Sequence, residues 1–176
     1  GTILIFDRKT GMLKSMMDGG LITNMRTGAA GAVGCKYLAR PESEVLLLVG
    51  TGAQGPVLLD ATLKVMKNIK RILVSNPHSP HKVPAFIDEI RPSIPADVDI
   101  LPVQDLETAV RSADIILTAT PSRRALILDQ WLKPGTHLSC IGSDMEGKQE
   151  LEEQILGRAK VFCDDLKQVD RKSTRL

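Results

Sequence analysis

"LLLVGTGAQGPVLL", residues 46–59, is the stretch that decides the fold. An apolar run stops at Gly50, two more glycines follow at Gly52 and Gly55, and a second apolar run begins. A continuous apolar run is typical of a strand buried on both faces of a parallel sheet, and the second run predicts a helix over residues 54–67. Because glycine is unfavourable inside helices and strands, three glycines at this junction indicate a turn with a specific purpose.

The Gly50-x-Gly52-x-x-Gly55 spacing between a strand and a helix matches the dinucleotide-binding fingerprint. Gly50 would make the tight turn, Gly52 would let the backbone approach a pyrophosphate, and Gly55 would let the helix pack close to the strand. The first helical turn would offer unpaired N–H groups and a partial positive charge to the phosphates. We therefore interpret the stretch as a dinucleotide site rather than as a purely structural glycine turn.

Strands and helices alternate after this stretch. We expect further strands over residues 71–75, 98–102, 114–120 and 136–143. We expect helices over residues 80–90, 106–113 and 148–159, the last of them before "KVFCDD" at 160–165. In the first of these helices Ser79 would be the N-cap and Pro80 the first residue, although Pro84 should disturb the first turn. The alternation predicts an α/β fold with a Rossmann-type doubly wound parallel sheet.

The first 40 residues have a different pattern. Residues 2–7 and 12–17 are short strand-like runs, and the "RKTG" between them has the composition of a hairpin turn. Residues 17–40 then predict a turn followed by a long helix. The small residues over positions 28–34 indicate that this helix packs closely against another backbone.

Composition excludes several classes of protein. The chain has 176 residues, 43% of them hydrophobic, and a net charge of +2. The excess of basic residues lies in the last seven residues, "DRKSTRL", so no basic patch indicates nucleic-acid binding. No apolar run approaches the ~20 residues of a membrane helix. The cysteines are odd in number and far apart, which favours a reduced, cytoplasmic protein: Cys35, Cys140 and Cys163.

Asn76 follows the second strand, where the fingerprint usually has an acid that binds the ribose hydroxyls. An asparagine can still hydrogen-bond a hydroxyl, and it does not repel a 2′-phosphate. We therefore favour NADP over NAD, with plain turn chemistry as the alternative for Asn76-Pro77. His78 and His81 have no third ligand in view, so we expect no metal site.

Four segments together resemble one known family. They are "MDGGLITNMRTGAAGAVGCKYLAR", "LVGTGAQG", "ADIILTATPS" and "PGTHLSCIGSDMEGKQEL". Over residues 1 to about 165 the chain is similar to the ornithine cyclodeaminase/mu-crystallin family. That family includes ornithine and lysine cyclodeaminases, ketimine reductases and an alanine dehydrogenase of the same fold. "RTGAAG" and "GKQEL" look somewhat closer to the alanine dehydrogenase type.

The resemblance implies roles for individual residues. Asp144 would be the catalytic acid/base residue, and Arg26 would bind the substrate carboxylate near the nicotinamide. The resemblance and the fingerprint give these cofactor-binding residues: Gly50, Gly52, Ala53, Gln54, Gly55, Asn76, Thr120, Gly142 and Lys148. The alternatives are ordinary ones, namely a surface charge for Arg26, a loop turn for Asp144 and a solvated helix start for Lys148.

The family's chemistry suits these residue types. The resemblance implies an NAD(P)-dependent oxidoreductase or cyclodeaminase that converts an amino acid, through an imine, into a cyclic amino acid and ammonia. An alanine dehydrogenase or a ketimine reductase is the alternative within the family. A non-catalytic NADPH-binding protein of the mu-crystallin type, or an unrelated nucleotide-binding sensor, is the alternative from another class. The expected partners are a small amino-acid or cyclic imine substrate and, at full length, a second copy of the protein.

The resemblance also divides the chain. We expect residues 1–23 to be the end of a truncated substrate and dimerisation domain, and residues 24–165 to be the NAD(P)-binding domain with its linking helix. Residues 166–176 would be a tail. A common sequencing-adaptor string would encode residues 170–176, so we expect them to be an artefact; an ordinary polar tail is the alternative.

Overall fold

The computed structural model describes residues 1–143 and 145–163. A five-stranded parallel sheet forms its centre, in the order β5-β4-β3-β6-β8. Its strands are β3 (Val45–Val49), β4 (Arg71–Ser75), β5 (Asp99–Pro102), β6 (Ile115–Thr118) and β8 (His137–Cys140). The chain starts in the middle with β3, runs to one edge, and returns to β6 on the other side of β3. This order confirms the predicted doubly wound α/β class.

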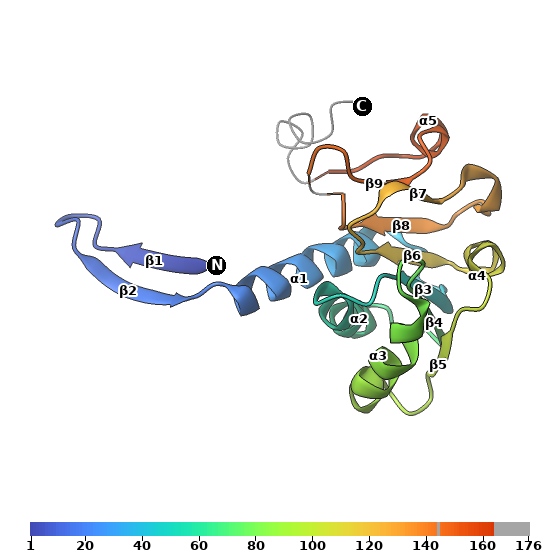
Figure 1. Cartoon of the computed structure of the whole chain (residues 1–176), viewed down its shortest axis with the longest axis horizontal. Coiled ribbons are helices and arrows are strands. Elements are labelled where there is room, and N and C mark those ends of the chain that lie inside the picture. The colour runs from blue at the N-terminus through green and yellow to red at the C-terminus, as the bar shows by residue number, and fades with distance from the viewer. Residues whose placement is uncertain (144, 164–176) are drawn as a thin grey trace.

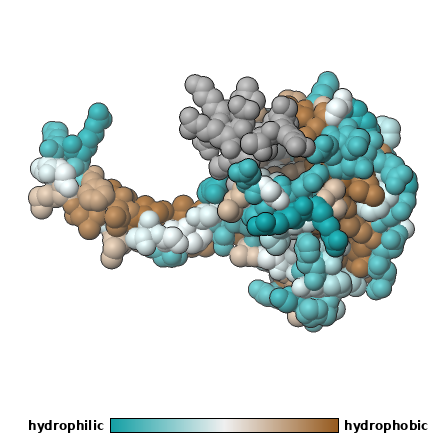
Figure 2. Space-filling view, turned by 45° about the horizontal axis from the view of Figure 1, so that its top comes forward, coloured by the Kyte–Doolittle hydropathy of each residue, from teal (hydrophilic) through white to brown (hydrophobic). Residues whose placement is uncertain are grey.

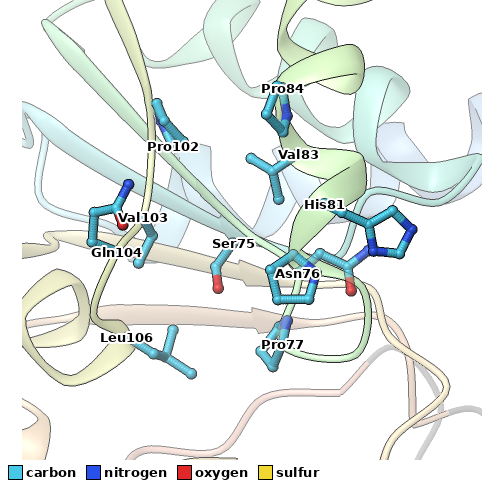
Figure 3. Close-up of a pocket in the computed structure, with 11 residues that line it drawn as sticks. Ser75, Asn76, Pro77, His81, Val83, Pro84, Pro102, Val103, Gln104 and Leu106 are labelled. Atoms are coloured by element: carbon cyan, nitrogen blue, oxygen red, sulfur yellow. The ribbon is translucent and has the colours of Figure 1, made fainter.

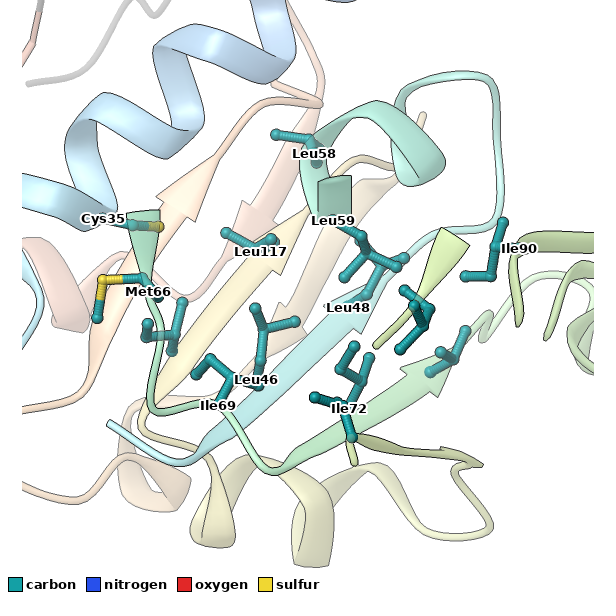
Figure 4. Packing of buried hydrophobic residues seen from close by; sticks show 14 of the residues in the cluster. Cys35, Leu46, Leu48, Leu58, Leu59, Met66, Ile69, Ile72, Ile90 and Leu117 are labelled. Atoms are coloured by element: carbon teal, nitrogen blue, oxygen red, sulfur yellow. The ribbon is translucent and has the colours of Figure 1, made fainter. Parts of the chain in front are cut away.

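Helices cover both faces of this sheet (Figure 1). The helices are α1 (Gly20–Leu38), α2 (Gln54–Val65), α3 (Val83–Ile90), α4 (Leu106–Ser112) and α5 (Gln154–Arg158). Along β3, Leu46 and Leu48 pack on the side of α1, α2 and α3, as Figure 4 shows. The alternate residues Leu47 and Val49 pack with α4 and with residues near the C-terminal end of the described chain. A strand with two buried faces needs an apolar residue at every position, which is the pattern that the sequence has here.

The small residues of α1 bring it into close contact with α2, as predicted. A Cβ added at Gly28 would lie 2.8 Å from Cγ1 of Val57, and one at Gly31 would lie 2.7 Å from Cδ2 of Leu58. Both distances are too short for real carbon atoms, so any larger residue would push the two helices apart. The contact fixes α1 beside the start of α2.

An arm extends from this domain (Figure 1). It consists of the antiparallel hairpin of β1 (Thr2–Phe6) and β2 (Leu13–Asp18) and the first turns of α1. Figure 2 shows hydrophobic residues gathered along it. The large exposed ones are Leu4, Ile5, Phe6, Met12, Leu13, Met16, Leu21, Ile22 and Met25. A patch of this kind is typical of a surface that is covered by other protein. No helix in the described part of the chain is both long enough and apolar enough to cross a bilayer.

The predicted helix over residues 148–159 is wrong. Residues Gln149–Leu151 form strand β9, and only Gln154–Arg158 are helical. Strand β9 pairs in parallel with β7 (Arg123–Ile127), which the sequence analysis did not predict. The residues of β9 have good helix propensity, but tertiary pairing with a distant strand overrides a local preference. Residues 160–163 have no regular structure, and the tail lies outside the described residues.

The helix expected from Pro80 begins later. Residues Pro80–Lys82 form a 3-10 turn, and α3 starts at Val83 with Pro84 in its first turn. Ser79 makes no side-chain capping bond. Proline has no backbone N–H to donate, so the chain before Pro84 forms this tighter turn and not a turn of α-helix. Pro84 itself is tolerated because it lies in the first turn of α3.

His137 gives the fold a predictable response to acid. Its Nε2 atom is buried near Gly34 of α1 and has no hydrogen-bond partner among the described residues. Burial lowers the pKa of His137 below its ordinary value of 6.5. The unfolded chain therefore takes up the proton more readily, so the free energy of unfolding should fall as the pH drops below 6.5.

His137→Gln should flatten the dependence of the free energy of unfolding on pH. His78→Gln should leave this dependence unchanged, because His78 is exposed. Urea unfolding at a series of pH values on either side of 6.5 measures it. An equal slope in His137→Gln and in the original chain would contradict the assignment to His137.

Candidate functional site

The turn over residues 50–55, called the glycine turn below, joins β3 to α2. Gly50 has φ +115°, a conformation that side chains disfavour. A Cβ there would collide with the carbonyl group of Ala119, its carbon atom lying 2.9 Å away. The Gly50 N–H donates to the Ser75 carbonyl at 2.8 Å. Gly50 thus lies against the ends of β4 and β6, and glycine is required there by conformation and by space.

Gly52 differs from Gly50. A Cβ added at Gly52 would meet no protein atom within 4 Å. Neither close packing nor a positive φ explains a glycine here. The backbone of the turn is exposed at Gly52 and Ala53, directly before the start of α2, and α2 has no side-chain cap.

Gln54 connects the glycine turn to α1. Its Nε2 donates to Oδ1 of Asn24 at 3.0 Å. Its Oε1 is buried and has no partner among the described residues. The segment of α1 that carries Arg26 is therefore held beside the first turn of α2. The Arg26 side chain itself is exposed, and the ion pairs among the described residues do not include it.

Gly55 allows close packing, but mainly against α3. A Cβ there would lie 2.9 Å from Cζ of Phe86 and 3.3 Å from the Gly50 carbonyl oxygen. Contact with the strand was expected here, and it is present at the Gly50 carbonyl; the ring of Phe86, on α3, is nearer. The sequence alone gave no sign that this ring would lie there, because the contact depends on how α3 returns to the sheet.

Asn76 lies just after β4 and beside a pocket of about 400 Å³, lined by the ends of β4 and β5 and the start of α3 (Figure 3). Its Oδ1 accepts the Ser79 N–H at 3.0 Å, which is turn chemistry, and its Nδ2 donates to the Thr51 hydroxyl at 2.7 Å. Asn76 thus holds its own turn and fastens it to the glycine turn. His81 lines the same pocket.

Thr120 and Gly142 meet at Glu150, which lies within the predicted helix over residues 148–159 and was not among the expected site residues. Glu150 is 1% exposed and accepts four hydrogen bonds. The donors are the Thr118 hydroxyl, the N–H and hydroxyl of Thr120 and the N–H of Gly142. Residues 149–151 are Gln, Glu and Leu, which do not alternate between polar and apolar, and three residues are too few for a strand signal.

Two further expected site residues, Asp144 and Lys148, follow β8 in the sequence. Lys148 is half-buried and directly precedes β9, and its N–H donates to the Met145 carbonyl. Asp144 lies outside the described residues. Its neighbours follow β8, so they lie at the same edge of the sheet as the glycine turn.

The glycine turn, the Asn76 turn, Thr120 and Gly142 all lie at the carboxyl ends of the parallel strands. In open α/β sheets this is the edge where ligands bind, at the point where the strand order reverses. That point lies between β3 and β6, next to Gly50. The exposed backbone at Gly52 before an uncapped helix suits a pyrophosphate, and the pocket beside Asn76 suits a nucleoside. The residues present therefore fit a dinucleotide.

Among solved structures, an archaeal alanine dehydrogenase dimer with bound NAD superimposes with a TM-score of 0.85 at 34% identity, over 95% of this chain and 50% of the other. A Delta(1)-pyrroline-2-carboxylate reductase of Thermococcus litoralis in complex with NADH and L-proline gives a TM-score of 0.89 at 32% identity, over 98% and 52% of the two chains.

Curated relatives agree with this likeness. An alanine dehydrogenase of Archaeoglobus fulgidus is 38% identical over 162 residues, which are 91% of this chain and 48% of the relative. A Delta(1)-pyrroline-2-carboxylate reductase of Paracoccus denitrificans is 34% identical over 93% of this chain and 51% of the relative. The chain thus spans about half the length of the curated relatives it matches. The model of the ornithine cyclodeaminase/mu-crystallin family matches residues 1–174.

Proposed function

This chain belongs to the ornithine cyclodeaminase/mu-crystallin family, and on that premise we propose that it binds a nicotinamide dinucleotide at the glycine turn. The whole protein would use this cofactor for oxidoreduction at the α-carbon of a small amino acid or its imine. The observation that carries the proposal is the contrast between Gly50, which the fold requires, and Gly52, which no protein contact explains. A backbone left bare at that point is what a pyrophosphate needs.

When the cofactor is bound, its nicotinamide ring accepts or donates the hydride. The chain's own residues would orient the substrate and move its protons. Arg26 can pair with the α-carboxylate, because a guanidinium offers two parallel N–H donors to a carboxylate. Asp144 would exchange the proton of the amine or of the attacking water, which a carboxylate does well when its surroundings bring its pKa toward neutrality. Lys148 would add a cation near the cofactor.

Oxidation or reduction of a C–N bond is common to the reactions named for the relatives, namely alanine dehydrogenation and pyrroline-2-carboxylate reduction. A lysine cyclodeaminase that recognises lysine and ornithine is also similar, at 34% identity and a TM-score of 0.79. We propose that the whole protein acts as a cyclodeaminase on a diamino acid. The second candidate is imine reduction or alanine dehydrogenation, and the names of the two curated relatives favour this second candidate.

Two measurements test this function. Calorimetric titration of the chain with NAD, NADH, NADP and NADPH tests binding. An assay of the whole protein with ornithine, lysine, alanine and cyclic imines then follows the absorbance of the reduced cofactor and the release of ammonia. Ammonia without net change in cofactor indicates a cyclodeaminase, and a net change indicates a dehydrogenase or reductase. Binding without any turnover would favour a non-catalytic NADPH-binding protein, and no binding would refute the proposal.

Coenzyme choice gives a sharper prediction. Asn76→Asp should shift the preference toward NAD, because a carboxylate accepts the ribose hydroxyls and repels a 2′-phosphate. The repulsion and the lost contact should weaken NADP binding by roughly 1.5–3 kcal/mol. The Asn76 turn should survive, since the Thr51 hydroxyl can donate to a carboxylate. The ratio of the two dissociation constants, measured by titration, reports the effect.

Asn68→Asp is the matched control. It makes the same chemical change at an exposed residue whose Nδ2 donates to the Pro41 carbonyl and which does not line the pocket. The ratio should stay the same in this variant. An unchanged ratio in Asn76→Asp would reduce Asn76 to a turn residue.

We also propose that the whole protein is a homodimer. The archaeal alanine dehydrogenase structure is a dimer, and the exposed apolar arm of residues 2–25 needs a covering surface. Light scattering coupled to gel filtration measures the mass of the particle, and a monomer at micromolar concentration would contradict the proposal.

A further inference from the structure

Glu150 is an unusual buried carboxylate. It is 1% exposed, and no ion pair among the described residues includes it. Four hydrogen bonds take the place of a cation. On Oε1 it accepts the Thr120 N–H at 2.7 Å and the Thr120 hydroxyl at 2.8 Å; on Oε2 it accepts the Thr118 hydroxyl at 2.8 Å and the Gly142 N–H at 2.9 Å.

The four donors come from two separate parts of the chain. Thr118 ends β6 and Thr120 follows it, whereas Gly142 follows β8. Gly142 packs so closely here that a Cβ would lie 2.5 Å from Oε1 of Glu150 and from the Thr120 nitrogen. Between the two threonines, the Ala119 carbonyl lies against Gly50. The carboxylate therefore joins the segment after β6, which borders the glycine turn, to the segment after β8.

Only a carboxylate can accept all four bonds. The two hydroxyl groups can rotate and either donate or accept, but the two backbone N–H groups can only donate, and they point to different oxygens. A glutamine has one oxygen, so in either orientation its NH₂ group would face one of the two N–H groups. A buried N–H without an acceptor is unfavourable, and the segment that carries it would move away.

We propose that Glu150 is a positioning residue for the cofactor site. Its carboxylate ties residues 118–120, whose Ala119 carbonyl lies against Gly50, to Gly142 at the end of β8, and in that way it sets the edge of the sheet on which the dinucleotide lies. Glu150 does not itself touch the cofactor. The inference rests on the proposed function, because it concerns the shape of that same site.

Glu150→Gln tests it, with Glu152→Gln as the matched control. Glu152 lies two residues away and accepts one backbone N–H, that of Asp129, at 2.7 Å. An amide oxygen can replace it there. We expect the dissociation constant for the cofactor that the original chain binds best to rise tenfold or more in Glu150→Gln and to stay within about twofold in Glu152→Gln.

Thr118→Val separates positioning from general stability. It removes one hydroxyl donor and keeps both N–H bonds, so it should lower the urea midpoint yet keep the cofactor affinity within about threefold. The test compares the loss of cofactor affinity with the loss of stability in Glu150→Gln and in Thr118→Val. If affinity falls in both variants only in proportion to the lowered urea midpoint, Glu150 is merely structural and the proposal is overturned. An unchanged affinity in folded Glu150→Gln overturns it as well.

Amide hydrogen exchange in the original chain provides a readout that needs no variant to fold. The N–H groups of Thr120 and Gly142 should exchange slowly without cofactor, because both are bound to a buried carboxylate. Fast exchange of either one would overturn the proposal. If the original chain binds no dinucleotide, the proposed function fails, and exchange of these two amides still reports whether Glu150 holds the two segments.

Discussion

Gly50→Ala should lower the free energy of unfolding by about 3 kcal/mol or more. The residue has φ +115°, and a side chain held in such a conformation costs roughly 1–3 kcal/mol. The new methyl group would also collide with the Ala119 carbonyl, which belongs to the backbone and cannot rotate away. The clash would separate β3 from the segment after β6. Urea unfolding measures the loss, and titration should show that cofactor binding is lost with it.

Gly52→Ala provides the contrast. It meets no protein atom within 4 Å and has no positive φ, so the free energy of unfolding should change by less than about 1 kcal/mol. Cofactor affinity should nevertheless fall by tenfold or more, because the methyl group would occupy the approach to the pyrophosphate. Equal stability losses in the two variants would contradict the division between a structural and a ligand-facing glycine.

Asp144→Asn should reduce turnover of the whole protein by roughly 10²–10⁴-fold, the usual contribution of a positioned acid or base. Asparagine keeps the size of the side chain but cannot take up a proton near neutral pH. Cofactor affinity should change little, because the phosphates are expected at the glycine turn. The limb of the pH–rate profile that belongs to Asp144 should disappear. Steady-state kinetics with the best substrate from the assay above gives both readouts.

Asp97→Asn is the control for this variant, because Asp97 is exposed and lies before β5, at the opposite end of the sheet. Its turnover should equal that of the original protein. Near-normal turnover in Asp144→Asn, combined with a lower melting temperature, would make Asp144 a structural turn residue.

The structure confirms the predictions that rest on local chemistry. The run over residues 46–49 has no polar position, which is typical of a strand with two buried faces. The glycines of α1 predicted close packing, because a missing Cβ is useful only where another backbone comes near. The requirement for glycine at residue 50 also follows from the turn that must connect a strand to a helix. In each case the physical reason lies within a few residues of sequence.

The errors occur where distant segments decide the outcome. The stretch "KQELEEQ" has good helix formers, yet Gln149–Leu151 form a strand because β7 offers backbone partners. Gly55 lies close to the Gly50 carbonyl at the end of β3, as expected, but the nearer contact with Phe86 was missed, because the position of α3 depends on the whole crossover. Asn76 could be read either as a ribose contact or as a turn residue, and its bonds to Ser79 and Thr51 show that turn chemistry is present whatever else it does.

The sequence by itself determined the central strand, the glycine turn, the alternation of strands and helices from β3 to β6, and the family, because apolar periodicity and the lack of a Cβ act locally. Only the tertiary structure decided that Glu150 is buried. Its burial is compensated by donors 8 to 32 residues away. A charged side chain is expected at the surface until its partners are placed around it, and that placement is a property of the packed sheet and not of any single segment.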